Sequence, residues 1–341
     1  MTGRLLASPL PIVAAPMAGG ATTVGLAAAV ATAGGFPFLA GGYKTPEALA
    51  SEIAQLRCLT GEFGVNLFVP STDEVDEASF AAYAAEIAPE ASVYGLSMDA
   101  TPRTHDDWWE EKLALLRERP VPVVSFTFGL PEPAHVAAFR RAGTRVLATV
   151  TSAEEARRAA EIRVDGLVVQ GPDAGGHSAV FDARRTPGPG DTAELVRQVR
   201  HEAGLPVIAA GGIDGPAAVR RLAAAGAEAM VVGTLLLRTD EAGTSPSYRD
   251  ALADPRFTRT VITRAFTGRP ARALCNGFVE RHRHAELIAY PAVHHLTLAL
   301  RRAASAAGDA DRMHLWAGTG YRSARTGPAS QVVHRLAEAL A

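Results

Sequence analysis

The amino-acid sequence predicts an α/β fold, a (β/α)8 TIM barrel with a small helical subdomain near the C-terminus. Short apolar runs recur along the first two thirds of the chain, and helix-forming stretches lie between them. Most of these runs end in glycine or in a single polar residue. Continuous apolar runs that alternate with helices are typical of parallel strands covered on both faces, and the sequence holds enough of them to close a barrel.

The helices expected between these strands begin with recognisable caps. Thr45-Pro46-Glu47 combines an N-cap, a proline at N1 and an acidic first turn, and Ser152 to Glu155 has the spacing of a capping box. A Rossmann sheet explains fewer of the runs and would lack the GxGxxG turn after its first strand. We expect strands at 12–15, 36–40, 63–68, 121–126, 145–149, 166–169, 206–210 and 229–232, and helices near 22–33, 45–58, 76–87, 108–119, 192–201 and 217–225, with another that begins at 152.

The chain continues well past the last expected strand. Helix-forming stretches at 251–274 and 276–289 precede another expected helix at 293–306. We therefore expect a barrel over residues 1–238, a helical subdomain over the barrel mouth at 239–309, and a return to the barrel at 310–341 that ends in a helix near 329–341.

Composition excludes several classes of partner. The 341 residues carry a formal net charge of −2 without a long run of one sign, which argues against nucleic acid or an anionic membrane as the main partner. Cys58 and Cys275 lie far apart, so the sequence predicts neither a disulfide framework nor a cysteine metal site, and it suits a reducing cytoplasm. We expect no signal peptide and no membrane span. Oligomeric state is not predictable from these features.

One glycine-rich loop follows the sixth expected strand and ends on a histidine, His177. Gly175 and Gly176 would leave this side chain accessible, and no acid, cysteine or lysine competes with it at a strand end. We predict that His177 is the reactive residue; the alternative is a structural role with the ring bonded to a backbone carbonyl. The remaining histidines lack the spacing or the carboxylate partners of a metal site, so no metal is expected.

Two further glycine loops predict a phosphate site. Gly211 and Gly212 follow the seventh expected strand, and Gly233 and Thr234 follow the eighth. Barrels of this kind commonly bind phosphate after these two strands, where backbone N–H groups approach the anion closely. We also expect Thr234 to begin a helix whose positive end faces the phosphate.

Three side chains at strand ends predict a planar ring ligand. Met17, Asn66 and Gln170 would supply one flexible apolar group and two amides that both donate and accept hydrogen bonds. Each also has an ordinary explanation, as core filler or loop cap. Together they indicate a ligand of flavin or purine type.

Several motifs are similar to those of a known family. The motifs are Ala15-Pro-Met-Ala-Gly19, Phe63-Gly-Val-Asn66, Val124-Ser-Phe-Thr-Phe-Gly-Leu-Pro131, Gln170-Gly-Pro-Asp-Ala-Gly-Gly-His177, Pro206-Val-Ile-Ala-Ala-Gly-Gly212 and Gly233-Thr234. They resemble the nitronate monooxygenases, formerly called 2-nitropropane dioxygenases, over residues from about 10 to 325. The resemblance implies a barrel that binds FMN non-covalently, with the family's conserved histidine at His177.

The same resemblance assigns the other site residues. It implies that Met17, Asn66 and Gln170 contact the isoalloxazine ring and that Gly212, Gly233 and Thr234 hold the phosphate. Tyr290-Pro291 and Leu315 to Gly318 resemble the class I branch of the family, which makes Tyr290 and His294 candidates to contact substrate. The rest of the expected cofactor-binding set is Ala15, Gly175, Gly176 and Gly211.

The implied activity is oxidation of alkyl nitronates, such as propionate 3-nitronate, with O2 to a carbonyl compound and nitrite, without a nicotinamide. Ser178-Ala179 departs from the Arg-Gly or similar pair that many members carry, a difference that bears on the substrate. The nearest alternative is an FMN-dependent enoyl-ACP reductase that uses NADH. Two others are a phosphate-binding aldolase or isomerase without flavin, for which Lys44 and Lys112 are the only lysines, and a non-catalytic flavin-binding or partner-binding protein.

Overall fold

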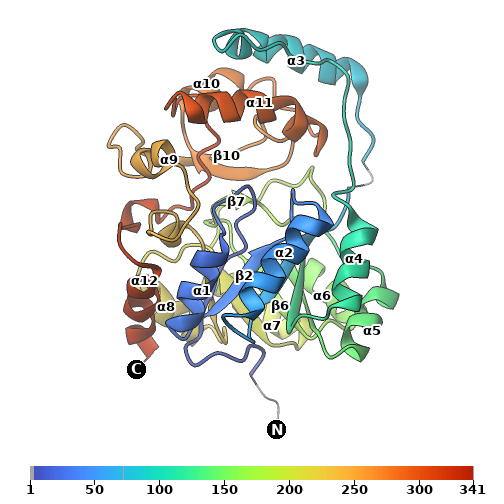
Figure 1. The fold of residues 1–341 in the computed structure, drawn as a ribbon, viewed down its shortest axis with the longest axis vertical. Coiled ribbons are helices and arrows are strands. Elements are labelled where there is room, and N and C mark those ends of the chain that lie inside the picture. The colour runs from blue at the N-terminus through green and yellow to red at the C-terminus, as the bar shows by residue number, and fades with distance from the viewer. Residues whose placement is uncertain (1–3, 72, 341) are drawn as a thin grey trace.

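Eight parallel strands form a closed barrel in the computed structural model, which describes residues 4–71 and 73–340 (Figure 1). The barrel closes where β1 pairs with β9, with Ile12 opposite Met230. This architecture confirms the predicted (β/α)8 barrel. Its strands in spatial order are β1 (Ile12–Ala14), β2 (Phe36–Ala40), β3 (Gly64–Phe68), β4 (Val123–Thr127), β5 (Arg145–Val150), β6 (Gly166–Gln170), β8 (Val207–Ala210) and β9 (Met230–Val232).

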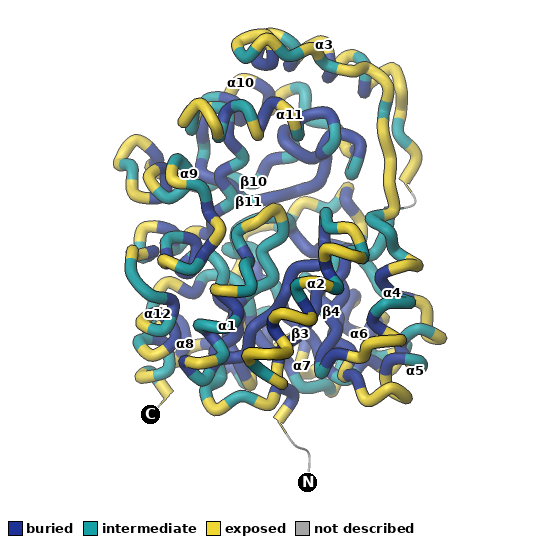
Figure 2. The backbone as a smooth tube through the Cα atoms, in the orientation of Figure 1, coloured by how far each residue is buried: buried dark blue, intermediate teal, exposed yellow. Residues whose placement is uncertain are grey.

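The helices around the barrel bury their apolar faces against the strands, and the core appears as dark blue strand segments in Figure 2. Two starts are capped as expected, because the hydroxyls of Thr45 and Ser152 each accept a backbone N–H of the first turn. The hydroxyl of Thr23 caps α1 in the same way. One helix, α5, is absent from the sequence-based assignment. The barrel helices are α1 (Val24–Thr32), α2 (Pro46–Arg57), α4 (Trp109–Glu118), α5 (Pro133–Arg141), α6 (Ala153–Glu161), α7 (Thr192–Ala203), α8 (Pro216–Ala224) and α12 (Ala329–Ala337).

The segment between β9 and α12, called the added segment below, contains both strands and helices and is not purely helical. The helix expected over 251–274 is wrong, because β10 (Thr260–Thr263) and β11 (Ala271–Leu274) form an antiparallel pair there. The β-branched residues of β10 favour a strand, and Gly268 and Pro270 interrupt any helix between the two strands. The helices of this segment are α9 (Pro246–Ala251), α10 (Gly277–His282) and α11 (Ala292–Ala306). Helix α10 ends well before the expected residue 289, whereas α11 agrees closely with the expected helix, and the boundaries at 238 and 309 stay a prediction.

A short third strand joins this segment to the barrel. β7 (Gly176–His177) lies in the loop after β6 and pairs with β11, with His177 opposite Ala271. The three-stranded sheet β10-β11-β7 therefore lies over the carboxyl ends of the barrel strands (Figure 1). Because β7 contains the predicted reactive histidine, the sheet fixes the backbone of that residue.

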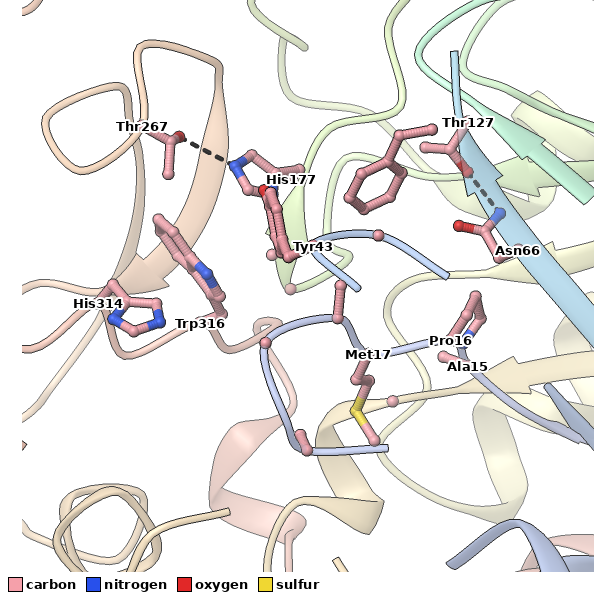
Figure 3. Close-up of a pocket in the computed structure, with 18 of the residues that line it drawn as sticks. Ala15, Pro16, Met17, Tyr43, Asn66, Thr127, His177, Thr267, His314 and Trp316 are labelled. Carbon is pink, nitrogen blue, oxygen red and sulfur yellow. Dashed lines mark hydrogen bonds between the residues drawn. The ribbon is translucent and has the colours of Figure 1, made fainter. Parts of the chain in front are cut away.

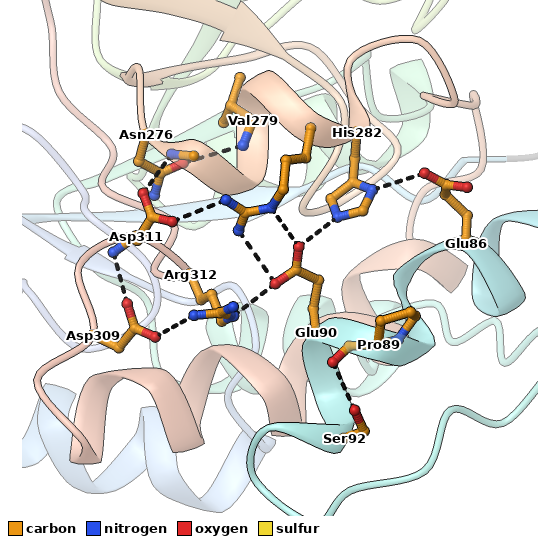
Figure 4. A network of polar contacts seen from close by, with 12 residues as sticks. Glu86, Pro89, Glu90, Ser92, Asn276, Val279, His282, Asp309, Asp311 and Arg312 are labelled. Carbon is orange, nitrogen blue, oxygen red and sulfur yellow. Dashed lines mark hydrogen bonds and ion pairs between the residues drawn. The ribbon is translucent and has the colours of Figure 1, made fainter.

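Helix α3 (Glu77–Ser92) extends from the barrel over the far side of the same segment (Figure 1). Phe80, Tyr83 and Ile87 pack in one apolar cluster with residues of the added segment such as Phe278. The buried carboxylate of Glu90 also accepts hydrogen bonds from the segment, and the donors are Arg281, His282 and Arg312 (Figure 4). These contacts attach α3 to the added segment by an apolar face and an ionic network. Among the described helices, none combines the length and the apolar character needed to cross a bilayer.

Candidate active site

A cavity of about 1030 Å³ lies between the barrel mouth and the added segment. Every residue assigned to the site from the sequence lines this cavity. Figure 3 labels four of them, Ala15, Met17, Asn66 and His177. The barrel supplies the strand ends and glycine loops, and the added segment supplies Tyr290 and His294. The structure thus brings all of these residues together, while their individual roles stay predictions.

His177 is held by contacts on both its backbone and its ring. Its backbone pairs with Ala271 of β11, and its Nε2 lies 2.9 Å from Oγ1 of Thr267 (Figure 3). Burial, followed by the positive charges of Arg269 and Arg301, lowers the pKa of His177 from 6.5 to about 3. The imidazole is therefore neutral at pH 7 and has a lone pair available to accept a proton.

Gln170 holds the loop that carries His177. Its side-chain nitrogen donates to the carbonyl oxygen of His177 at 3.0 Å, and its side-chain oxygen accepts from the N–H of Ala179 at 2.7 Å. The sequence analysis expected this amide to contact the ligand ring. Since the oxygen is engaged within the protein, the second N–H of Gln170 is the group left to donate to a ligand.

Asn66 is oriented by neighbouring strands. Its buried amide nitrogen donates to Oγ of Ser125 at 2.9 Å and to Oγ1 of Thr127 at 2.9 Å (Figure 3). These bonds use the donors of the amide, and they leave its carbonyl oxygen to accept a hydrogen bond in the cavity. Such an acceptor suits an N–H at the edge of a planar ring.

The glycine loops have the shape that a phosphate cradle needs. Gly211 and Gly212 have φ values of +99° and +72°, a backbone region that residues other than glycine rarely adopt. At Gly175 an added Cβ would lie 2.4 Å from the backbone nitrogen of Gly318, so the loop after β6 is packed closely against the segment that contains Gly318. The hydroxyl of Thr234 accepts the N–H of Gly318 at 3.0 Å and keeps its own hydrogen to donate to an anion.

This arrangement fits the phosphate end of a mononucleotide such as FMN, with one difference from the expectation. Thr234 does begin a helix, but it is a single 3-10 turn of 3 residues, Thr234–Leu236. Such a turn has almost no helix dipole, because the dipole sums over aligned peptide units. Backbone N–H groups and the Thr234 hydroxyl are then the donors that the site offers to phosphate.

The opposite wall of the cavity is aromatic and cationic. The ring of His294 stacks on Tyr43 with centroids 4.1 Å apart, and the hydroxyl of Tyr290 donates to that of Tyr43 at 3.1 Å. Arg301 donates to the carbonyl oxygen of His294 at 2.9 Å and is only 4% exposed. Burial, and then the charge of Arg301, lower the pKa of His294, so this imidazole is also neutral.

Two buried guanidinium groups contribute positive charge at or near the cavity. Arg269 is 2% exposed and lies over the ring of Phe128 at 4.0 Å, while Arg301 lines the cavity directly. Neither forms a salt bridge with a carboxylate of the described residues. Burial lowers the pKa of each to about 10, which leaves both protonated at pH 7. Unpaired buried cations favour an anionic ligand.

Comparison with known proteins identifies the family. The family model described as nitronate monooxygenase matches residues 5–339. The chain belongs to the nitronate monooxygenase family. A probable nitronate monooxygenase of Staphylococcus aureus strain Newman is 33% identical over 338 residues, which cover 98% of this chain and 95% of that protein. The homologue of strain MRSA252 is also 33% identical, with the same coverage.

Solved structures agree with this membership. A crystal structure of nitroalkane oxidase from Streptomyces ansochromogenes has a TM-score of 0.93 and 46% identity, and the match covers 98% of this chain and 96% of that chain. FabK from Thermotoga maritima is more distant, with a TM-score of 0.76, 27% identity, and coverage of 98% and 94%. Membership in the nitronate monooxygenases makes the chain an oxidoreductase and supports a nitronate-oxidising flavoenzyme. The flavin-free aldolase or isomerase alternative is therefore wrong.

Several cavity residues of this nitronate monooxygenase family member escaped the sequence analysis. Tyr43 adopts a φ of 65°, which its N–H contact with the Asp107 carboxylate supports, and no local pattern indicates it. Thr267 and Arg301 belong to segments far from His177 in sequence. The Phe128 ring meets the His177 ring edge-on at 5.7 Å, and the quoted motif that contains Phe128 was the only available signal.

Proposed function

We propose that this chain is an FMN-dependent nitronate monooxygenase. It oxidises alkyl nitronates, such as propionate 3-nitronate, with O2 to a carbonyl compound and nitrite, and it needs no nicotinamide. The observation that carries the proposal is a neutral cavity histidine, His177, close to two buried arginines without a carboxylate partner, of which Arg301 lines the cavity, in a nitronate monooxygenase family member.

The cofactor is assigned to the barrel side of the cavity. Bound FMN would supply the redox chemistry of the reaction. Gly211, Gly212, Gly233 and Thr234 hold its phosphate through backbone N–H groups and one hydroxyl. The accepting oxygen of Asn66, with the remaining N–H of Gln170 and the thioether of Met17, faces its ring.

The substrate is assigned to the space between His177 and the aromatic wall. A nitronate is an anion, and the charges of Arg269 and Arg301 favour its entry over that of a neutral molecule. His177 accepts the acidic α-proton when the ligand arrives as a nitroalkane, because its lone pair is free at neutral pH. The side chains of Tyr290 and His294 form the far side of the substrate pocket.

The alternative is a reductase that resembles the FMN-dependent enoyl-ACP reductases and consumes NADH. The observation that favours this reductase is the likeness to FabK, at 27% identity over nearly the full chain. The nitronate monooxygenase proposal is preferred because the solved nitroalkane oxidase is closer in both sequence and structure.

Turnover assays separate these activities. Heat release of the cofactor followed by chromatography is expected to give FMN and no FAD. Propionate 3-nitronate is expected to cause O2 consumption and nitrite formation, and His177→Asn to lower the rate of nitroalkane turnover by about a hundredfold or more. NADH oxidation with an enoyl thioester, in the absence of nitrite formation from any nitronate, would instead establish the reductase.

A further inference from the structure

Thr267 contacts His177 from the other side of the cavity. It lies in the turn between β10 and β11, is 1% exposed, and lines the cavity. Its Oγ1 is 2.9 Å from Nε2 of His177, although 90 positions separate the two residues (Figure 3). The added segment therefore supplies a ring partner to the predicted reactive group of the barrel.

Counting hydrogens favours one direction for this bond. A threonine hydroxyl has one hydrogen to donate, and Oγ1 of Thr267 also lies 3.4 Å from the carbonyl oxygen of Arg269. A carbonyl only accepts. If the hydroxyl donates to Arg269, its lone pair receives Nε2–H of His177 and both bonds form together. The reverse direction would give the hydrogen to Nε2 and leave the Arg269 carbonyl without this donor.

The other ring nitrogen is then available to a ligand. No described residue forms a hydrogen bond with Nδ1 of His177, and this atom is not sealed within the protein. Because a neutral imidazole has one hydrogen, an Nε2–H tautomer leaves Nδ1 with a free lone pair. The base is thus directed into the cavity by the bond on the opposite side of the ring.

Contacts other than Thr267 hold the backbone of His177 in place. Pairing with Ala271 and the hydrogen bond from Gln170 already fix it. What these contacts leave open is the rotation of the ring and the position of its single hydrogen. The Thr267 hydroxyl acts on both, since a bond at 2.9 Å restricts the ring and selects the protonated nitrogen.

We propose that Thr267 is a positioning residue that holds His177 as the Nε2–H tautomer, with unprotonated Nδ1 directed at the substrate. The proposal rests on the proposed function for its kinetic consequence, because a base is needed only when a nitroalkane loses its α-proton. The tautomer itself is a property of the protein and is measurable without turnover.

The tautomer is tested by 15N NMR of the holoenzyme with labelled histidine, at pH 7. His177→Asn identifies the resonances of His177 by their loss. Wild type and Thr267→Ser are expected to show a protonated Nε2 and an unprotonated Nδ1, whereas Thr267→Val, which has nearly the same shape but no hydroxyl, is expected to show a mixture. A protonated Nδ1 in wild type, or an unchanged spectrum in Thr267→Val, would overturn the proposal.

Kinetics test the consequence. Thr267→Val is expected to lower kcat for a nitroalkane by about tenfold, the effect of one lost hydrogen bond, and to change kcat for the preformed nitronate much less. Thr267→Ser should restore kcat to within about twofold of wild type. Thr263→Val is the matched control, because Thr263 is a buried, hydrogen-bonded threonine of β10 that does not line the cavity.

The two proposals fail in distinguishable ways. If the tautomer changes as expected but wild type oxidises neither nitronate nor nitroalkane, the proposed function is wrong and the positioning role stands. If wild type turns over nitroalkanes and Thr267→Val matches it for both substrates, the positioning role is wrong and the proposed function stands. Equal cofactor content and thermal stability of the variants exclude misfolding as the cause of a loss.

Discussion

The side-chain amide of Gln170 bonds the carbonyl oxygen of His177 at 3.0 Å and, through its oxygen, the N–H of Ala179 at 2.7 Å. One residue at the end of a barrel strand therefore binds the loop backbone at His177 and again two positions later, at Ala179. These two hydrogen bonds attach this part of the loop to the barrel. A rigid base is expected to favour proton transfer, because its nitrogen stays at the reacting distance.

Replacing Gln170 tests this attachment. Gln170→Leu removes both hydrogen bonds and leaves backbone groups of His177 and Ala179 unsatisfied, so it should lower the free energy of unfolding by roughly 1–3 kcal/mol. Gln170→Glu keeps an acceptor for Ala179 but loses the donor to His177, so it should still reduce kcat. Urea unfolding and nitroalkane kinetics provide the measurements. If Gln170→Leu kept the stability and kcat of wild type, the two hydrogen bonds of Gln170 would have no role in holding the loop or in turnover.

A second prediction concerns the close packing of the glycine loops. Gly175→Ala would place a Cβ 2.4 Å from the backbone nitrogen of Gly318, so the loops must move apart. We expect a loss of at least about 1–3 kcal/mol in the free energy of unfolding and weaker retention of flavin. Gly188→Ala is the control, since its Cβ meets no atom within 4 Å. Unfolding curves and cofactor content after gel filtration measure both effects, and equal behaviour of the two variants would contradict the predicted cradle.

A third prediction follows from the lowered pKa of His177. With a pKa of about 3 in the folded protein, the free enzyme has a neutral His177 from pH 5 to 8, so kcat/KM for a nitronate should show no inflection near 6.5 from this group. In the unfolded chain the same histidine titrates near 6.5. Its contribution to stability is therefore complete above pH 6.5 and is lost as the pH falls toward 3, because only the unfolded state binds the proton in that window.

The stability part of this prediction is measured by urea unfolding at pH values from 7 to 4. His177→Asn should show a smaller loss of stability on acidification than wild type. His201→Asn, which changes an exposed histidine of α7, is the control. Parallel curves for wild type and His177→Asn would contradict the lowered pKa.

A fourth prediction concerns the buried charge of Arg301. Arg301→Met removes a cation that lines the cavity, so KM for an anionic nitronate should rise by roughly tenfold, while KM for a neutral nitroalkane should change less. The pKa of His177 should also rise toward its ordinary value, because Arg301 contributes to its depression. Arg220→Met, on the exposed face of α8, is the matched control. Equal changes of KM for the two substrates would indicate a packing effect instead of charge.

The barrel was predictable because its signals are local. Each parallel strand is a continuous apolar run, and caps such as Thr45 and Ser152 mark the helices between them. The carboxyl ends of the strands then converge by geometry alone, which is why Met17, Asn66 and Gln170 line one cavity. The alternation of the elements thus predicted the location of the site before any contact was known.

The added segment was harder to predict because its order depends on distant contacts. Residues 251–274 contain helix formers, but β11 is stabilised by pairing with β7, a partner almost 100 positions earlier. The contact of Thr267 with His177 likewise joins residues 90 positions apart, so no local pattern indicates it. No local pattern indicates either that Arg301 is buried without a carboxylate partner. Gln170 lies in the cavity as predicted, yet its side chain binds the backbone of the loop at His177 and Ala179, and these contacts depend on how the loop folds back over the strand end.

The absorbance spectrum of the purified protein under anaerobic conditions is the sharpest test of the proposed function. We expect flavin bands in the isolated protein, rapid bleaching on addition of propionate 3-nitronate, and no comparable change with NADH. Readmission of O2 should restore the bands, with nitrite in the solution. Rapid bleaching by NADH together with no response to the nitronate would contradict the proposed function and favour the reductase.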